Sequence, residues 1–150
     1  MSLDYRMPLF DRLTDDHPAQ QAEPVPLRRY NQAQALASIR RELTRLLGAR
    51  RATLPHRFAA SIIDYGVPDW SGFAQTQATD TRSLQRQLTG LLTQFEPRIH
   101  RPQVQVSTDP DNAAHVLLQV SGSLVGDAAH EPVVFINAVL RGEQLEVRDE

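Results

Sequence analysis

The stretch LQRQLTGLLTQFEPRIHRPQVQVS, residues 84–107, changes its hydrophobic period halfway along. In its first half the apolar residues recur at the three- and four-residue spacing of a helix: Leu84, Leu88, Leu91, Leu92 and Phe95. After Pro97 the pattern alternates strictly from Gln103 to Ser107, which is typical of a strand. Because Pro97 disfavours a helical conformation for the residue before it, we expect the helix to end at Phe95 or Glu96.

The helical spacing also precedes this stretch, and the alternation continues after it. Asn31 and Gln34 have the spacing of a capping box, and the stripe that follows contains Leu36, Ile39, Leu43, Leu46 and Leu47. Strands are expected over His115–Leu124 and Pro132–Leu140 and around Leu145 and Val147. Helices followed by hairpin-linked strands predict an α+β domain, with N-terminal helices packed on a small, mostly antiparallel C-terminal sheet.

Residues 1–30 are predicted to form a proline-rich N-terminal arm, and residues 31–150 a single domain. The arm contains a short amphipathic island: Leu9, Phe10, Asp11, Arg12 and Leu13. One helical turn is not stable alone in water, so we expect this island to pack on its own domain or on a partner.

The composition excludes several kinds of chemistry. The 150 residues include no cysteine, and all 16 basic residues are arginine, which excludes disulfides, thiolate sites and Schiff-base lysines. The five histidines lack metal-ligand spacing and the glycines are dispersed, so we predict no metal and no cofactor. The net charge of −2 argues against bulk nucleic-acid binding, and no apolar run reaches the length of a membrane span. The N-terminus lacks a secretory hydrophobic region, which favours a cytoplasmic protein.

Charge is distributed unevenly along the chain. Residues 31–60 hold six arginines and one glutamate, whereas residues 101–150 hold three arginines and eight acidic residues. These stretches could be ordinary solvated faces, or they could dock between partners of opposite charge. The arginines from Arg40 to Arg57 could also contact phosphate or RNA, a reading that we rank below the others.

Glu96, Pro97 and Arg98 form the most distinctive short motif. One interpretation is an internal ion pair at a helix-to-strand joint, and another is a rigid, two-pronged contact with a partner. A third is a muramidase-like glycoside hydrolase, in which Glu96 works with Asp64 or Asp69. Arg98 weighs against the third, because a nearby guanidinium stabilises the charged carboxylate and a general acid must hold its proton.

Four segments in a fixed order resemble a known family. They are Pro8–Leu13 with Asp15 and Asp16, the helix with Ser38–Leu43, the turn Asp64–Asp69, and Glu96–Arg98. Together they resemble the contractile-tail baseplate wedge family, whose domain is often labelled lysozyme-like and which includes the baseplate subunit of type VI secretion. The resemblance implies a structural protein without enzymatic activity, in a cytoplasmic baseplate docked near the inner membrane.

The resemblance also implies partners and contact residues. The partners would be other wedge subunits and the contractile sheath, whose first ring the domain would template, with no nucleic acid, membrane insertion or small-molecule substrate. Glu96, Pro97 and Arg98 would be an assembly contact, and we assign the island Leu9–Leu13 to partner binding as well. An exposed sheet edge can pair with another chain, so we expect one edge within residues 103–147 to accept a sheath strand.

Overall fold

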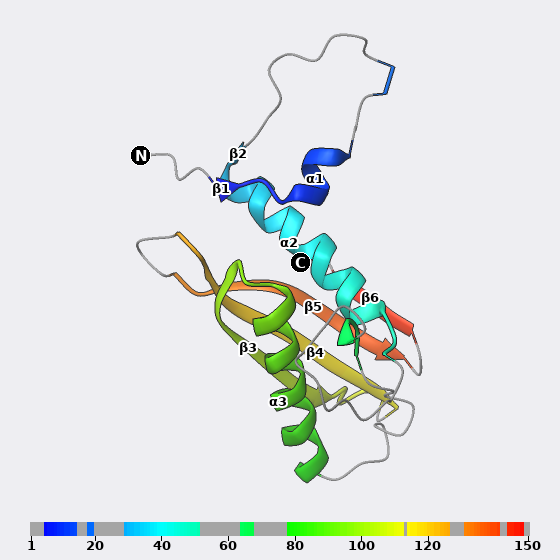
Figure 1. The fold of residues 1–150 in the computed structure, drawn as a ribbon. Coiled ribbons are helices and arrows are strands. Elements are labelled where there is room, and N and C mark those ends of the chain that lie inside the picture. The colour runs from blue at the N-terminus through cyan, green and yellow to red at the C-terminus, as the bar shows by residue number, and fades with distance from the viewer. Residues whose placement is uncertain are drawn as a thin grey trace.

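The computed structural model of the chain describes residues 5–14, 18–19, 29–51, 64–67, 78–112, 114–126, 131–141 and 144–148. Most of the proline-rich part of the arm lies outside these ranges, as does Asp69. The elements in chain order are β1 (Tyr5–Arg6), α1 (Leu9–Leu13), β2 (Arg29–Tyr30), α2 (Gln32–Gly48), α3 (Ala78–Phe95), β3 (Ile99–Thr108), β4 (His115–Leu124), β5 (Val133–Arg141) and β6 (Gln144–Arg148) (Figure 1).

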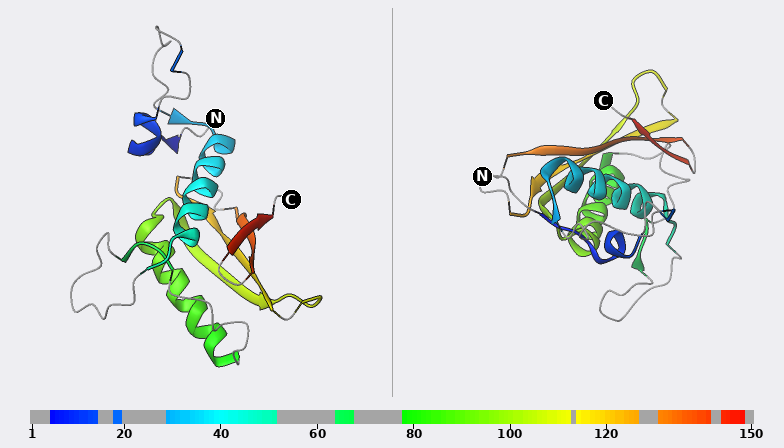
Figure 2. Two further views of the ribbon diagram at one scale, coloured as in Figure 1. Left: turned by 90° about the vertical axis from the view of Figure 1, so that its right-hand side faces the viewer. Right: turned by 90° about the horizontal axis from the view of Figure 1, so that it is seen from above.

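The predicted α+β class is confirmed. Strands β3, β4, β5 and β6 form an antiparallel sheet in chain order, and α2 and α3 cover the same face of it (Figure 2). Helix α3 contacts β3, while α2 crosses over β5 and β6. The two helices and one sheet therefore make two layers around one core.

The core lies between the helices and the inner face of the sheet. The strand register aligns Val106, Leu118, Ala138 and Val147 in one row across the four strands. From the helices, the stripes expected from the sequence supply fully buried side chains, among them Ile39, Leu43, Leu46, Leu88 and Leu92. The apolar stripes of the helices and the inward-facing residues of the strands thus pack into one contiguous hydrophobic cluster.

The helix ends largely follow the expected signals. In the capping box of α2, the Asn31 side chain accepts a hydrogen bond of 2.9 Å from the Gln34 backbone N–H. The Asn31 backbone N–H in turn donates to the Gln34 side chain at 3.0 Å. Helix α3 ends at Phe95, as Pro97 predicts, and the chain enters β3 at Ile99, four residues before the alternating pattern begins.

An irregularity near the start of β3 explains why the sequence pattern begins late. The register of β3 against β4 shifts between His100 and Gln103, and Arg101 adopts a positive φ of 49°. Opposite this bulge lies Gly122, where a Cβ would come within 2.7 Å of Ile99 Cγ2 and 3.0 Å of the His100 carbonyl oxygen. Only glycine allows this close approach of the two strands.

The two ends of the arm are joined to each other, which the sequence did not predict. Strand β1 pairs antiparallel with β2, with Tyr5 opposite Tyr30. This small sheet lies beside the first turn of α2, and α1 follows β1 along the same helix (Figure 1). Residues 5–6 and 29–30 of the arm therefore lie at the same point of the domain.

Candidate functional site

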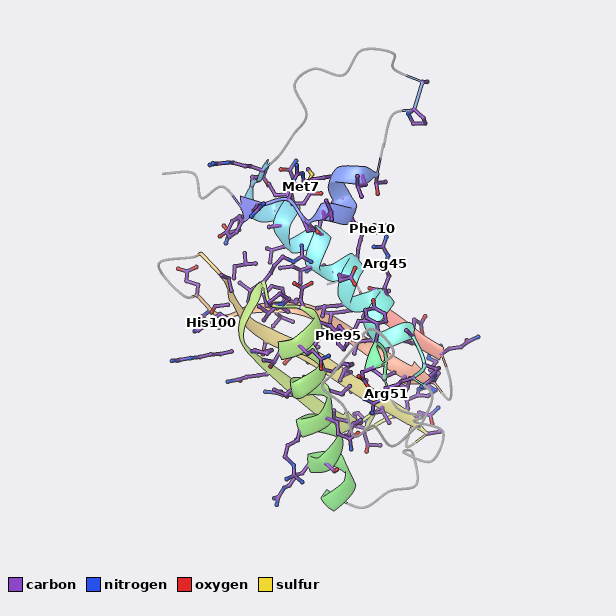
Figure 3. The ribbon with its side chains drawn as sticks, viewed as in Figure 1. Met7, Phe10, Arg45, Arg51, Phe95 and His100 are labelled. Carbon is purple, nitrogen blue, oxygen red and sulfur yellow. The ribbon has the colours of Figure 1, made fainter. Side chains whose placement is uncertain are left out.

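A groove of about 690 Å³ lies between the arm and the joint at which α3 passes into β3. Its lining comes from the arm, from α2 and from this joint: Pro8, Phe10, Glu42, Arg45, Phe95, Glu96, Pro97 and Arg98. Figure 3 shows Phe10, Arg45 and Phe95 following one another along this side of the molecule. Of the residues predicted to contact a partner, the structure thus brings Phe10 of the island to the same groove as Glu96, Pro97 and Arg98, more than 80 residues away in the sequence.

The arm presents an unusual amount of apolar surface beside this groove. Leu9 and Phe10 are each 68% exposed and Leu13 is 75% exposed. No residue of α1 is buried. Within the described structure, therefore, the apolar face of the island is not packed on its own domain, although α1 itself forms as predicted. The Arg45 guanidinium lies 5.8 Å from the centre of the Phe10 ring, a cation–π distance.

Tyr65 forms an aromatic pair with Phe95, which lines the groove. The rings of Tyr65 and Phe95 meet edge to face, with their centres 5.4 Å apart. The Tyr65 hydroxyl donates a 3.0 Å hydrogen bond to Glu42. Burial and this bond to the Glu42 carboxylate raise the pKa of Tyr65 to about 12. Tyr65 therefore remains neutral at physiological pH and fixes Glu42 at the side of the groove.

Glu96 is buried, with 1% of its surface exposed, and its charge is matched within the chain. Arg98 Nε and Nη2 donate to Glu96 Oε1 and Oε2, each at 2.6 Å. The internal ion pair is therefore present at the joint. Pro97 is exposed and Arg98 is half-buried, so these two residues offer the accessible surface of the motif. Whether a partner contacts them stays a prediction.

Asp11 attaches α1 to the domain. Its Oδ2 atom accepts hydrogen bonds from Ser38 Oγ at 2.6 Å, from the Tyr30 hydroxyl at 3.1 Å and from Arg41 Nη2 at 3.4 Å. Partial burial acts to raise the pKa of Asp11. The hydrogen bonds from Ser38 and Tyr30 and the charges of Arg41 and Arg98 outweigh burial, and the pKa is lowered. The Asp11 side chain thus bonds to other residues of the same chain. Arg12, the next residue, is exposed.

Glu96 and Asp64, one of the two carboxylate pairs of the hydrolase interpretation, do not line the same groove, and Asp69 lies outside the described residues. Asp64 lines a different pocket, together with Arg51 and Gln87. The other carboxylate beside Glu96 in the groove is Glu42, which bonds to Tyr65 and lies 3.5 Å from Arg45. Within the described ranges, no three His, Asp or Glu side chains are grouped so that they could hold a metal ion.

Sequence reasoning missed several residues that build the site. No contact was predicted for Glu42, Arg45, Tyr65 and Phe95, because they come from α2, from the turn at residues 64–67 and from the end of α3, and only the tertiary fold gathers them. Ser38 lies in the buried stripe of α2 and belongs to the segment Ser38–Leu43 that carries the resemblance, but no role was predicted for its side chain. It contacts both Asp11 and Arg98.

The fold and the groove define a small α+β domain whose distinctive surface is apolar and bordered by arginines. Residues 33–129 match the sequence model of the family described as baseplate wedge protein gp25, and the chain belongs to this family. It is a structural baseplate subunit whose partners are other baseplate subunits. The named family agrees with the resemblance found in the sequence.

A solved structure has the same fold. One chain of a baseplate complex from the type VI secretion system superimposes with a TM-score of 0.53 at 19% sequence identity. The match covers 79% of this chain and 97% of that one. Among curated proteins, none matches the chain. Along the described part of the chain, no helix has the length and apolarity needed to cross a membrane.

Proposed function

We propose that this baseplate subunit is a TssE-type wedge protein of a type VI secretion system, working in a cytoplasmic baseplate docked near the inner membrane. Two observations support the proposal. The chain belongs to the baseplate wedge family, and its fold matches a chain of a type VI secretion baseplate complex along nearly all of that chain. The ordered motifs of the sequence favour the same assignment.

The groove beside α1 is the proposed contact with another wedge subunit, and the meeting of Phe10 with Glu96, Pro97 and Arg98 in its lining carries the proposal. The charges exposed around it are mainly positive. Arg41 and Arg45 have side chains 54% and 53% exposed. The neighbouring carboxylates are more covered, at 32% or less: Asp11, Glu42 and Glu96. We therefore expect the occupant to be a partner segment with an apolar face and acidic flanks.

The sheath contact is proposed for the β6 edge of the sheet. At the opposite edge, the register shift around Arg101 interrupts β3, and Pro102 has no N–H to donate to an added strand. Among the described strands, β6 pairs with β5 alone. Removal of β6 should abolish sheath initiation and leave a wedge that still assembles. Normal initiation after this deletion would refute the sheath contact.

We also propose that the protein is not an enzyme, against the alternative of a muramidase-like hydrolase that uses Glu96. Both oxygens of Glu96 are engaged by Arg98, and the side chain is buried. If the protein were a hydrolase, wild type would cleave cell wall and Glu96→Gln would abolish cleavage while keeping its partners. We expect no cleavage from wild type, and loss of partner binding from Glu96→Gln and at least as much from Arg98→Glu.

Co-purification of the full chain with wedge subunits tests the groove directly. Phe10→Ala removes the most accessible aromatic ring of the lining, and Arg45→Glu reverses a charge at its border. Each change should weaken association at least about tenfold, as for an interface anchor. Gln105→Ala, on an exposed position of β3, is the matched control and should bind like wild type. Unchanged binding by both groove variants would exclude this surface.

A further inference from the structure

Four side chains connect the end of α3 to the arm through direct hydrogen bonds. Glu96 holds Arg98 at 2.6 Å, and Arg98 Nη1 donates to Ser38 Oγ at 2.9 Å. Ser38 Oγ then donates to Asp11 at 2.6 Å. The chain of contacts spans residues from position 11 to position 98 and passes through α2.

The direction of these bonds is fixed by chemistry. A guanidinium has donors and no acceptor, so Ser38 must accept from Arg98. The single hydroxyl proton of Ser38 is then left for Asp11, which as a carboxylate can only accept. Successive hydrogen bonds of this kind polarise and strengthen one another. The ion pair at the joint therefore orients the hydroxyl group that holds the arm.

Helix α1 itself buries little surface. A helix of five residues does not persist in water by itself, and α1 buries none of its residues. The attachments of α1 and the strand before it include the bonds to Asp11, the contact of Arg45 with Phe10, the pairing of β1 with β2 and the packing of Tyr5 against the core. Of these, the bond from Ser38 to Asp11 is the shortest.

We infer that Glu96 and Arg98 are positioning residues for the arm: through Ser38 and Asp11 they hold α1 so that Leu9, Phe10 and Leu13 face outward beside the groove. The role of this surface in assembly rests on the proposed function, whereas the coupling between the motif and α1 does not. Besides lining the groove, the motif thus acts on partner binding through Ser38 and Asp11, neither of which lines the groove.

Ser38→Ala in the full-length protein tests the coupling, because Ser38 is 3% exposed and does not line the groove. The measurement is backbone order of α1 by NMR relaxation in the free protein. In wild type, the amides of residues 9–13 should have order parameters near the rigid value of about 0.85, and in Ser38→Ala they should fall below about 0.6. Thr44→Ala is the matched control, since this hydroxyl on α2 bonds only to the Arg40 carbonyl.

A second variant and a second measurement separate the possible outcomes. Arg98→Lys keeps the positive charge but lacks the planar fork that serves Glu96 and Ser38 together, so it should also loosen α1. Both variants should weaken binding to purified wedge subunits by roughly tenfold. Wild-type order of α1 in both variants would overturn the coupling and leave the proposed function standing. A loosened α1 with unchanged binding would overturn the positioning role. If Phe10→Ala and Arg45→Glu also bound like wild type, the proposed groove contact would fail as well.

Discussion

Arg98 donates a 2.6 Å hydrogen bond to each carboxylate oxygen of Glu96, although only Pro97 separates the two residues along the chain. The pair is formed within one tight joint, where the rigid ring of Pro97 limits the motion of both neighbours. A buried charge of this kind is costly when its counterion is removed, because the remaining group is left without a partner.

Glu96→Gln should therefore destabilise the protein. The amide keeps the shape and can still accept one hydrogen bond, so we expect a loss of about 1–3 kcal/mol in the free energy of unfolding. Urea denaturation measures it. The matched control is Glu146→Gln, because Glu146 pairs with Arg141 on the surface, with side chains 55% and 51% exposed. That change should cost less than about 1 kcal/mol. Equal effects of the two substitutions would contradict the structural importance of the buried pair.

The attachment of α1 through Asp11 should weaken at low pH. Because the pKa of Asp11 is lowered in the folded protein from an ordinary value of 3.8, its stabilising contribution is complete above that value. The contribution is lost as the pH falls through the lowered pKa, where the carboxylate becomes protonated. NMR shifts of the α1 amides should report this transition in wild type. In Asp11→Asn the acid transition should be absent, and its persistence would point to another titrating group.

Tyr65 should make the stability of the protein fall at high pH. Its pKa is raised to about 12 from an ordinary 10.0, so the contribution of its bond to Glu42 is complete below pH 10. Stability falls as the pH rises beyond that, because the unfolded chain loses this proton first. The tyrosinate absorbance of wild type minus that of Tyr65→Phe should titrate near pH 12. A difference titration near the ordinary value would contradict the burial of this hydroxyl.

Two glycines should respond in opposite ways to alanine. At Gly122 the added methyl group would meet Ile99 and the His100 carbonyl oxygen, so we expect Gly122→Ala to cost about 1–3 kcal/mol. At Gly90, on the exposed side of α3, no atom lies within 4 Å of the new Cβ. Gly90→Ala should therefore stabilise the helix by about 0.5–1 kcal/mol. Thermal unfolding of both variants measures these changes. A Gly122→Ala protein as stable as wild type would contradict the predicted clash.

The layers of the fold could be predicted from the sequence because burial imposes a period. The stripes of α2 and α3 and the alternation of β4 follow directly from which faces must be apolar. The start of β3 could not be predicted, since the bulge at Arg101 interrupts the alternation. The pairing of Tyr5 with Tyr30 is equally hidden, because two-residue strands are too short to show a period.

The site was predictable only in part, for a different physical reason. Leu9–Leu13 and Glu96–Arg98 stood out because an amphipathic turn in an arm and a charge pair around proline are locally unusual. Their meeting at one groove depends on how α2 packs, and local patterns carry no information on that. Ser38 illustrates the limit, because its importance comes from contacts with residues 27 positions before it and 60 positions after it.

The bulge around Arg101 and Pro102 has a consequence for the number of chains that one subunit can recruit. A sheet with two available edges can grow from both sides, and copies of such a sheet can join into open-ended fibres. Under the proposed pairing at β6, each subunit would add one strand to this sheet, because the register shift and Pro102 interrupt the β3 edge. A ring of such subunits would seed as many added strands as it has members, and the interrupted β3 edge would disfavour polymerisation of the subunits with one another.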